Sequence, residues 1–284
     1  MATSIGKNVA SISTDGMKKL IVDCGATKAD WVLDDGKTSI RTPGFNLAQT
    51  PPEQLHRILD EVSFRLGSDI GEVHFYAAGL VGTPPVDLGR WFPGADIEYA
   101  SDMLGAARAV CGREPGIAAI IGTGANTCQY DGTDITRKVN CGGFILGDEG
   151  SAAVLGKLFL TDYLKGFVPK ELSEAFAAQF PADYPSLVKE VYGSAAPARF
   201  LGSLAPFLLA HYTAYEYVKN LIDNNFRAFF ERAIRQYDTL PLGITGGFAY
   251  ACRDILPGIG REYGIPITTI SASPVAGLLQ YHGL

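Results

Sequence analysis

The sequence predicts an α/β protein in which one βββαβαβα unit occurs twice, with a helical insertion in the second copy. Short apolar runs separated by turns alternate with segments of helical period, and the same order restarts near Ile117. A glycine-rich turn also occupies the same place in each copy. Because the two copies share negligible sequence identity, the duplication rests on the order of elements. Two copies of one α/β unit imply a cleft between them.

The first copy shows every element of the unit. Strands are predicted at 20–22, 31–33, 39–41, 73–77 and 97–100, because these runs are short, apolar and bounded by turn residues. A helix begins at Pro51-Pro52 and keeps apolar residues at helical spacing until Gly67. A short helix follows Pro84-Pro85, and Ser101-Asp102 opens the last helix of this copy.

The second copy repeats this order around its insertion. Strands are predicted at 117–121, 127–130, 135–139, 242–245 and 267–270. The helical insertion covers 151–238. One helix follows Gly246-Gly247, and the terminal helix follows Ser273-Pro274.

These patterns divide the chain into a domain at 17–113 and a domain at 114–284. Residues 1–16 are small and polar, so we expect a disordered extension or a tag remnant outside the fold. No apolar stretch reaches the roughly 20 residues of a membrane-spanning helix, and the start lacks the pattern of a signal peptide. The sequence therefore predicts a cytoplasmic protein without a membrane partner.

Charge and cysteine content favour small-molecule chemistry. The formal net charge of the 284 residues is −6 and no long basic run occurs, which argues against a nucleic-acid partner. The five cysteines form no CxxC pair, and the four histidines lack metal-ligand spacing. Reduced, buried thiols are the expectation, and a homodimer is left open.

The first turn, Asp23-Cys24-Gly25-Ala26-Thr27-Lys28, has the composition of a phosphate-binding turn. Gly25 and Ala26 let backbone N–H groups approach phosphate oxygens, Thr27 offers a hydroxyl and Lys28 a positive charge. Asp23 can hold Mg²⁺ through water. The alternative is an ordinary hairpin turn.

The second turn, Gly122-Thr123-Gly124-Ala125-Asn126, stands at the same place in the second copy. Thr127 replaces the third glycine of a dinucleotide-binding fingerprint, and a strand follows where that fingerprint requires a helix. We therefore reject a nicotinamide site. A Walker-type loop is also absent from the sequence, because the nearest match, from Gly150 to Leu158, has the wrong spacing.

Carboxylates mark two further candidate positions. Asp148 and Glu149 follow Gly142-Gly143 in a glycine-rich stretch and are placed to bind sugar hydroxyls. Asp148 or Ser151 could instead cap the next helix.

Asp102 lies between a strand and a helix, where a carboxylate could accept the proton of an attacking hydroxyl. Asp102 could equally be a helix cap, in competition with Ser101. Gly246-Gly247 lets a nucleobase or ribose lie against the backbone, or serves helix packing.

The ordered motifs DCGATKADW, SDMLGAA, GTGAN, GGFILGDEGS and TGGFA resemble the BadF/BadG-type ATPase family, in particular its N-acetylglucosamine kinase branch. The resemblance covers nearly all of residues 17–284. It implies duplicated ribonuclease H-like domains of the sugar kinase, heat-shock 70 and actin superfamily, with ATP and Mg²⁺ in the cleft. It also implies phosphoryl transfer to the 6-hydroxyl of N-acetylglucosamine or N-acetylmuramic acid.

By position, the resemblance implies that Asp102 is the catalytic base. Thr27 and Thr123 resemble contacts to the β- and γ-phosphates, and Gly246-Gly247 resembles the adenosine motif. The residues that would bind the sugar acceptor are Asn46, Ala125, Asn126, Gly142, Gly143 and Asp148; those that would bind nucleotide are Gly25, Ala26, Thr27, Lys28, Gly122, Thr123, Gly246 and Gly247.

Three positions depart from the family pattern. Relatives often have Gly or Ser at Ala26, Ser at Ala125 and Trp at Gly142. Replacing Trp with Gly opens volume that could admit the lactyl ether of N-acetylmuramic acid.

Two other functions stay open from the sequence. An activator ATPase of the same superfamily would need cysteines that hold an iron–sulfur cluster, and the spacing here lacks pairs. A non-catalytic sugar sensor would need a DNA-binding helix pair.

Overall fold

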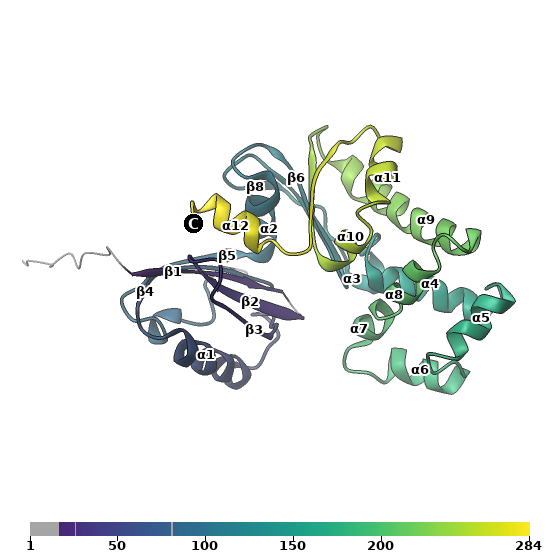
Figure 1. The fold of residues 1–284 in the computed structure, drawn as a ribbon, viewed down its shortest axis with the longest axis horizontal. Coiled ribbons are helices and arrows are strands. Elements are labelled where there is room, and N and C mark those ends of the chain that lie inside the picture. The colour runs from purple at the N-terminus through teal and green to yellow at the C-terminus, as the bar shows by residue number, and fades with distance from the viewer. Residues whose placement is uncertain (1–16, 26, 81) are drawn as a thin grey trace, which may run out of the picture. The chain divides into compact units, whose positions relative to one another are not determined.

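The computed structural model describes residues 17–284 except 26 and 81. The expected N-terminal extension at 1–16 and the expected phosphate contact at Ala26 lie outside the described residues. Contacts divide the chain into two compact units, the first ending at Ala100 and the second running from Ser101 to Leu284. Figure 1 shows both units, with most of their helices and strands labelled.

The first unit is built on a five-stranded sheet of order β3-β2-β1-β4-β5. The strands are β1 (Lys18–Cys24), β2 (Lys28–Leu33), β3 (Ser39–Pro43), β4 (Ile70–Ala77) and β5 (Asp96–Ser101). Strands β1, β2 and β3 form an antiparallel meander, and β4 is parallel to β1. The register places Asp23 opposite Asp30 across the β1–β2 pair.

One apolar core holds the first unit together. Helix α1 (Pro52–Leu66) turns its stripe of buried residues, Leu55, Ile58, Leu59, Val62 and Leu66, toward this core. The rings of Trp31, Phe45 and Phe75 pack together there, with centroids 6.1 to 6.5 Å apart. The short segment after Pro84-Pro85 is a single 3₁₀ turn, Leu88–Arg90.

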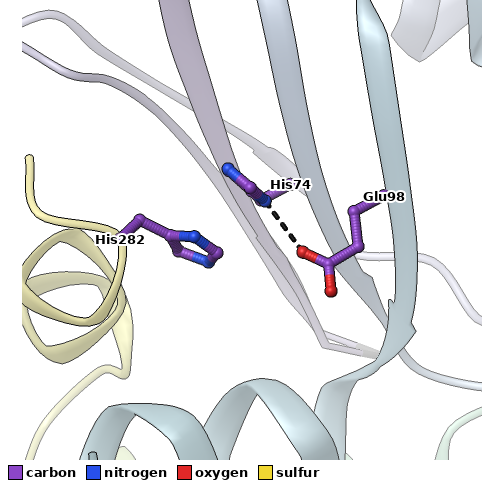
Figure 2. Close-up of side chains that lie close together, drawn as sticks. All are labelled: His74, Glu98 and His282. Atoms are coloured by element: carbon purple, nitrogen blue, oxygen red, sulfur yellow. Dashed lines mark hydrogen bonds and ion pairs between the residues drawn. The ribbon is translucent and has the colours of Figure 1, made fainter.

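A buried histidine joins β4 to β5 in this sheet. Nδ1 of His74 lies 2.8 Å from Oε2 of Glu98, and Nε2 lies 2.8 Å from Oε1 of Glu72. Figure 2 shows the His74 ring directed at the Glu98 carboxylate. Both ring nitrogens therefore lie within ion-pair distance of a carboxylate.

The second unit repeats the sheet, with the order β10-β9-β6-β7-β8. The strands are β6 (Gly116–Ile121), β7 (Ala125–Tyr130), β8 (Ile135–Arg137), β9 (Leu242–Thr245) and β10 (Ile267–Ser271). Strands β6, β7 and β8 are antiparallel, whereas β9 is parallel to both β6 and β10. The predicted α/β fold class is confirmed, since each unit contains a five-stranded mixed sheet with the same topology.

Helices make up most of the rest of the second unit. Their bounds are α2 (Asp102–Cys111), α3 (Gly143–Leu146), α4 (Ala152–Leu164), α5 (Lys170–Ala177), α6 (Tyr184–Tyr192), α7 (Pro197–Gly202), α8 (Ala205–Ala210), α9 (Glu216–Arg232), α10 (Gly247–Ala251), α11 (Leu256–Glu262) and α12 (Val275–Tyr281). A 3₁₀ turn, Ile234–Gln236, follows α9. The helical insertion predicted at 151–238 thus contains α4 to α9.

Helices α3 and α11 were not predicted. Helix α3 is one turn inside a glycine-rich stretch, and Gly142 precedes it in the left-handed region at φ 75°. Helix α11 contains Pro257 and Gly258, which read as helix breakers in a sequence. The proline stands in the first turn, where its missing N–H costs no hydrogen bond.

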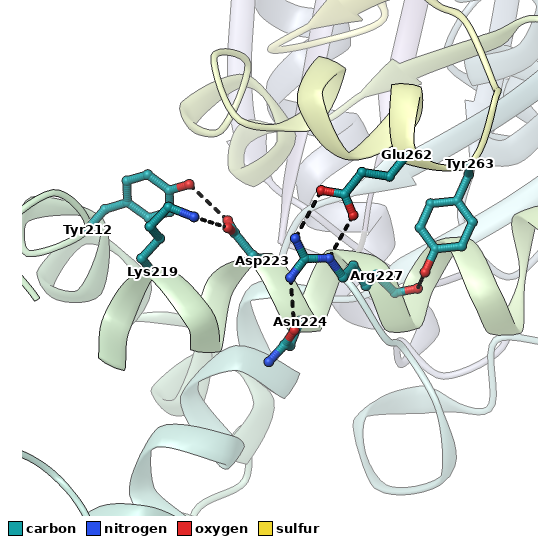
Figure 3. A network of polar contacts seen from close by, with 7 residues as sticks. All are labelled: Tyr212, Lys219, Asp223, Asn224, Arg227, Glu262 and Tyr263. Carbon is teal, nitrogen blue, oxygen red and sulfur yellow. Dashed lines mark hydrogen bonds and ion pairs between the residues drawn. The ribbon is translucent and has the colours of Figure 1, made fainter. Parts of the chain in front are cut away.

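Helix α9 is fixed to its neighbours by two polar clusters (Figure 3). The buried carboxylate of Asp223 accepts hydrogen bonds from Tyr212 and Lys219 at 2.8 and 2.7 Å. One turn further, the guanidinium of Arg227 donates two hydrogen bonds to Glu262 of α11, at 2.8 and 2.9 Å. These contacts fix the direction of α9, which lines the candidate site described below.

Packing places the boundary between the units before α2. Helix α2 closes the first copy in element order, yet it packs on β6 of the second unit. The predicted domains, 17–113 and 114–284, follow the repeated order of elements, and this division stays a prediction.

All five cysteines are free thiols. Cys24, Cys128 and Cys252 are buried as expected, and burial raises the pKa of Cys128 and Cys252 to about 12. Cys141 departs from the expectation because it is exposed. No helix in the described part of the chain combines the length and apolar character that a membrane crossing needs.

Candidate active site

The first glycine-rich turn is the connection of the β1–β2 hairpin. Gly25 donates a backbone hydrogen bond to the carbonyl of Lys28 at 3.1 Å, which closes the turn. Thr27 and Lys28 are exposed there. The ammonium of Lys28 lies 3.3 Å from the carboxylate of Asp30. The turn is thus a hairpin connection, and it also presents a hydroxyl and a cation to solvent.

The predicted sugar ligand Asn46 belongs to a loop that packs on this turn. Gly44 donates to the carbonyl of Thr27 at 3.0 Å, and a Cβ at Gly44 would collide with the carbonyl of Gly25. The Asn46 side-chain oxygen accepts from Ala48 N–H at 2.9 Å. Its amide nitrogen stays available to donate to a ligand.

Asp23, the predicted Mg²⁺ residue, is half-buried near the end of β1, one residue before this turn begins. A carboxylate at a turn with exposed hydroxyl and backbone groups fits the oxygen donors that hydrated Mg²⁺ prefers.

The second glycine-rich turn connects β6 to β7 in the second unit. Gly122 donates to the carbonyl of Gly124 at 2.9 Å. The first residues of α4, Ala152 and Ala153, donate to the carbonyls of Gly122 and Thr123 at 3.0 and 3.1 Å. The start of α4 therefore fixes the backbone of the turn that would bind phosphate. The residues after the turn form β7, which agrees with the rejection of a dinucleotide-binding helix.

The third motif brings Asp148 against the second turn. Asp148 is a non-glycine residue in the left-handed region, at φ 55°, and its N–H donates to the carbonyl of Cys141 at 2.8 Å. A Cβ added at Gly124 would lie 2.8 Å from Oδ2 of Asp148. A side chain at position 124 would therefore displace the Asp148 carboxylate from its present place.

The environment of Asp148 favours its neutral form more than water does. Burial raises the pKa of this carboxyl, and the charge of Glu149 raises it further. Hydrogen bonds from the backbone of Ala125 and Gly143, together with the charge of Lys157, oppose these effects.

Ser151, rather than Asp148, caps α4. The Ser151 hydroxyl accepts from Val154 N–H at 3.2 Å. This geometry leaves the Asp148 carboxylate outside the cap.

A shallow pocket of about 40 Å³ gathers three of the predicted acceptor residues of the second unit. It is lined by Ala125, Asn126, Thr127, Val139, Asn140, Cys141, Asp148, Glu149, Phe229, Arg232 and Ala233. Three predicted sugar ligands, Ala125, Asn126 and Asp148, thus share one concave surface, which we call the acceptor pocket. Gly142 and Gly143 do not line it, but they follow Cys141 directly and begin α3.

The predicted catalytic base, Asp102, is the first residue of α2 and is not its cap. The hydroxyl of Ser101 accepts from Leu104 N–H at 3.2 Å, which is the N-cap contact. The Asp102 carboxylate accepts from Met103 N–H at 2.8 Å. Burial raises the pKa of Asp102, against the effects of this hydrogen bond and the charge of Lys138. A carboxylate with a raised pKa is a stronger proton acceptor.

The predicted adenosine motif separates into two different glycines. Gly246, at φ 127°, packs so closely that a Cβ would collide with the carbonyl of Ile121. Gly247 faces open space. Gly246 therefore serves packing between β9 and β6, and Gly247 leaves a bare backbone surface at the start of α10.

Asn225 is a residue of this region that the sequence did not single out. It is 2% exposed on α9; its side-chain oxygen accepts from Gly150 N–H at 3.0 Å and its amide donates to the carbonyl of Ser151 at 3.1 Å. It thereby holds the backbone just after Asp148 and Glu149. The signal in the sequence is a polar residue within the apolar face formed by Ile222, Phe226 and Phe229.

A scan of protein-family models and a search of curated proteins both find no match to this chain. Among solved structures, a proposed N-acetylglucosamine kinase from Porphyromonas gingivalis is 38% identical with a TM-score of 0.88, over 93% of this chain and 98% of that chain. A second, from Chromobacterium violaceum, is 22% identical with a TM-score of 0.68, over 93% and 98%.

A glucokinase of the ROK family from Streptomyces griseus, in complex with glucose and AMPPNP, is 16% identical with a TM-score of 0.53, over 93% of this chain and 97% of that chain. At these lower identities, the second and third similarities concern the fold alone. The first extends over nearly the whole of both chains at 38% identity. The chain therefore belongs to the N-acetylglucosamine kinase family, which comprises carbohydrate kinases of the actin-like ATPase fold.

Proposed function

We propose that this protein transfers the γ-phosphoryl group of ATP to the 6-hydroxyl of an N-acetylated amino sugar, N-acetylglucosamine or N-acetylmuramic acid. The observation that carries the proposal is Asp102, a half-buried carboxylate with a raised pKa that is not used as the helix cap. The family relationship supports a sugar as acceptor. As part of this proposal we assign the chain to the BadF/BadG-type branch, which its motifs resemble.

In the proposed reaction, Asp102 orients the acceptor hydroxyl and takes its proton. The hydroxyl oxygen forms a bond to the γ-phosphorus while the bond from that phosphorus to the bridging oxygen breaks, and ADP leaves. Thr27 and Thr123, with the backbone of their turns, stabilise charge on the transferred group. Mg²⁺ near Asp23 would neutralise phosphate charge when bound.

Acceptor recognition falls to polar groups around the acceptor pocket. Asp148 accepts hydrogen bonds from sugar hydroxyls, and Asn126 supplies an amide from the same surface. Asn46, in the first unit, is the further sugar ligand that the motif resemblance implies. Ala125 lacks the hydroxyl of its relatives, and Gly142 lacks their indole ring.

The test is a coupled assay of ADP release with N-acetylglucosamine, N-acetylmuramic acid, N-acetylmannosamine, glucosamine and glucose. We expect release above background with an N-acetylated acceptor, and ³¹P NMR of the product should show coupling to the two protons on C6. If every sugar left ADP release at background, the kinase proposal would fail. A product phosphorylated at C1 would support kinase activity but contradict the assignment of the 6-hydroxyl as acceptor.

The alkylation rate of exposed Cys141 can measure acceptor binding without turnover. The thiol lies in the acceptor pocket, whereas Cys24, Cys128 and Cys252 are buried. We expect iodoacetamide to alkylate Cys141 first, and a bound acceptor to slow this reaction because it covers the thiol. Mass spectrometry of the peptide measures the rate. An unchanged rate at saturating acceptor would contradict the assignment of this pocket.

A further inference from the structure

A second, larger pocket adjoins the acceptor pocket in the same unit. It has a volume of about 480 Å³. Pockets that take small molecules commonly enclose roughly 300–1,000 Å³. Its lining comes from α3, α4 and α9 and consists of Ile145, Leu146, Gly147, Glu149, Val154, Lys157, Leu158, Leu221, Asn224, Asn225, Ala228 and Arg232. The second pocket is therefore large enough to hold a small molecule or a substituent of one.

The two pockets share an ion pair as their common wall. Glu149 and Arg232 are the residues that line both. A guanidinium nitrogen of Arg232 lies 3.4 Å from a carboxylate oxygen of Glu149. The Arg232 side chain is 71% exposed, so most of its donors remain available to a ligand on either side.

The charges on the second pocket favour an anion. Lys157 and Arg232 are its cations and Glu149 is its one anion, which leaves a net charge of +1 in a chain of net charge −6. The ammonium of Lys157 donates to the carbonyl of Phe144 at 2.6 Å. This contact holds the ammonium beside α3.

The remaining wall of the second pocket is mostly apolar. Its apolar members are Ile145, Leu146, Val154, Leu158, Leu221 and Ala228. Ile145 and Leu146 are 71% and 85% exposed, so this apolar surface is open to a ligand. A ligand that matches this pocket combines an anionic group with a short apolar body.

We infer that the second pocket is a subsite for an acidic, partly apolar substituent of the amino-sugar acceptor, and that Arg232 selects that substituent. The inference rests on the proposed function, because the sugar ring must lie over the adjoining acceptor pocket, whose own volume of about 40 Å³ takes only part of the ring. A lactyl ether, with one carboxylate and one methyl group, is such a substituent. A sugar without the acid leaves the pair of Glu149 and Arg232 intact and the second pocket empty.

The experiment compares N-acetylmuramic acid with N-acetylglucosamine as acceptors of the intact enzyme and its variants. For Arg232→Gln we expect KM for N-acetylmuramic acid to rise about tenfold, since a charged hydrogen bond is lost, with kcat nearly unchanged. KM for N-acetylglucosamine should rise clearly less than KM for N-acetylmuramic acid, because this sugar has no carboxylate for the guanidinium to bind, although Arg232 also lines the acceptor pocket. Glu149→Gln should lower KM for the acidic sugar, because it frees the guanidinium.

Two further variants distinguish the effect of the Arg232 charge from the effect of space in the second pocket. Ala228→Phe fills the second pocket from α9 and should raise KM for N-acetylmuramic acid alone. Arg235→Gln is the matched control: this arginine lies one turn beyond Arg232, pairs with Glu231 at 2.9 Å and does not line either pocket. It should leave both KM values unchanged. Thermal melting checks that each variant is folded.

Each outcome has a defined meaning. If N-acetylglucosamine is phosphorylated but N-acetylmuramic acid is not, or if Arg232→Gln changes both KM values equally, the subsite is refuted and the kinase stands. If neither sugar is phosphorylated, the proposed function itself fails.

Discussion

At the scale of single residues, two neighbours at the start of α2 have different roles: Ser101 caps the helix and Asp102 is the proposed base. Ser101 supplies the cap contact, which leaves the next carboxylate, Asp102, free of that role. Burial of Asp102 raises its pKa and therefore opposes its ionised form in the folded protein. A side chain that costs stability when charged is typical of a functional position.

Asp102→Asn is expected to abolish most turnover without loss of stability. The amide keeps the size of the carboxylate but cannot take a proton, and it removes a charge that burial disfavours. Coupled ADP release should fall by about a hundredfold or more, while urea unfolding at neutral pH gives a free energy no lower than that of the wild type. Ser101→Ala is the control, and it should lower stability by about 1 kcal/mol through loss of the cap. Near-normal turnover of Asp102→Asn would contradict the assignment of Asp102 as the catalytic base.

The raised pKa of Asp102 also predicts the acid limb of the pH–rate profile. Below its pKa the carboxyl is protonated and cannot act as base, so kcat/KM should fall with decreasing pH, starting above the range of an ordinary aspartate. The cation of Lys138 lowers this pKa. Lys138→Met should therefore move the acid limb to higher pH. A profile that is unchanged by this substitution would contradict the assignment of the limb to Asp102.

At the scale of elements, helix α9 carries the support for the acceptor pocket. Its residue Asn225 fixes the backbone of Gly150 and Ser151, and its last residue, Arg232, lines the pocket. Phe229, also on α9, packs so closely on Gly150 that a Cβ there would lie 2.8 Å from the phenylalanine Cβ. The insertion therefore orients the loop that presents Asp148.

Asn225→Ala is expected to lower both stability and acceptor affinity. The substitution leaves a buried N–H at Gly150 and a buried carbonyl at Ser151 without their partner, which costs about 1–3 kcal/mol. Urea unfolding measures this loss. Because the loop before α4 is then less well fixed, acceptor KM should rise, whereas KM for ATP should change less.

Asn224→Ala is the matched control for that variant. Asn224 is the exposed neighbour on α9 and accepts a surface hydrogen bond from Arg227 at 3.0 Å. Its loss should be close to neutral for stability and for KM of N-acetylglucosamine, which is the acceptor used in this comparison because Asn224 also lines the second pocket. Equal effects of the two substitutions would show that Asn225 has no special role in fixing the loop.

At the scale of the whole molecule, the order of elements could be predicted because it follows from local patterns. The strand at 242–245 is correct at both ends, since Pro241 and Gly246 bound a short apolar run. Tertiary contacts could not be predicted in the same way. The sequence shows Asn225 as a polar residue on an apolar face, but its partners lie about 75 residues away along the chain.

The candidate site was predictable to a similar extent. The motif that contains Asp148 was found, and its place against Gly124 was not, because that contact depends on how β7 and α4 meet. Ser101 and Asp102 are both good cap residues, so the choice between them needed the hydrogen-bond geometry. The ion pair of Glu149 and Arg232 could not be predicted, because the two residues are far apart in the sequence.

The two units are expected to unfold as separate cooperative blocks. Each of the three clusters of buried apolar residues among the described residues belongs to one unit. Both tryptophans of the chain, Trp31 and Trp91, belong to the first unit, so their fluorescence reports on that unit. Circular dichroism at 222 nm reports mainly on the second unit, which contains α2 to α12.

Urea titration should therefore give two curves that do not coincide. The fluorescence change is expected at lower urea, because the smaller unit buries less apolar surface per residue. A saturating acceptor, which binds the acceptor pocket of the second unit, should move the circular-dichroism transition to higher urea. Superimposable transitions from both probes, with and without acceptor, would show instead that the chain unfolds in one cooperative step.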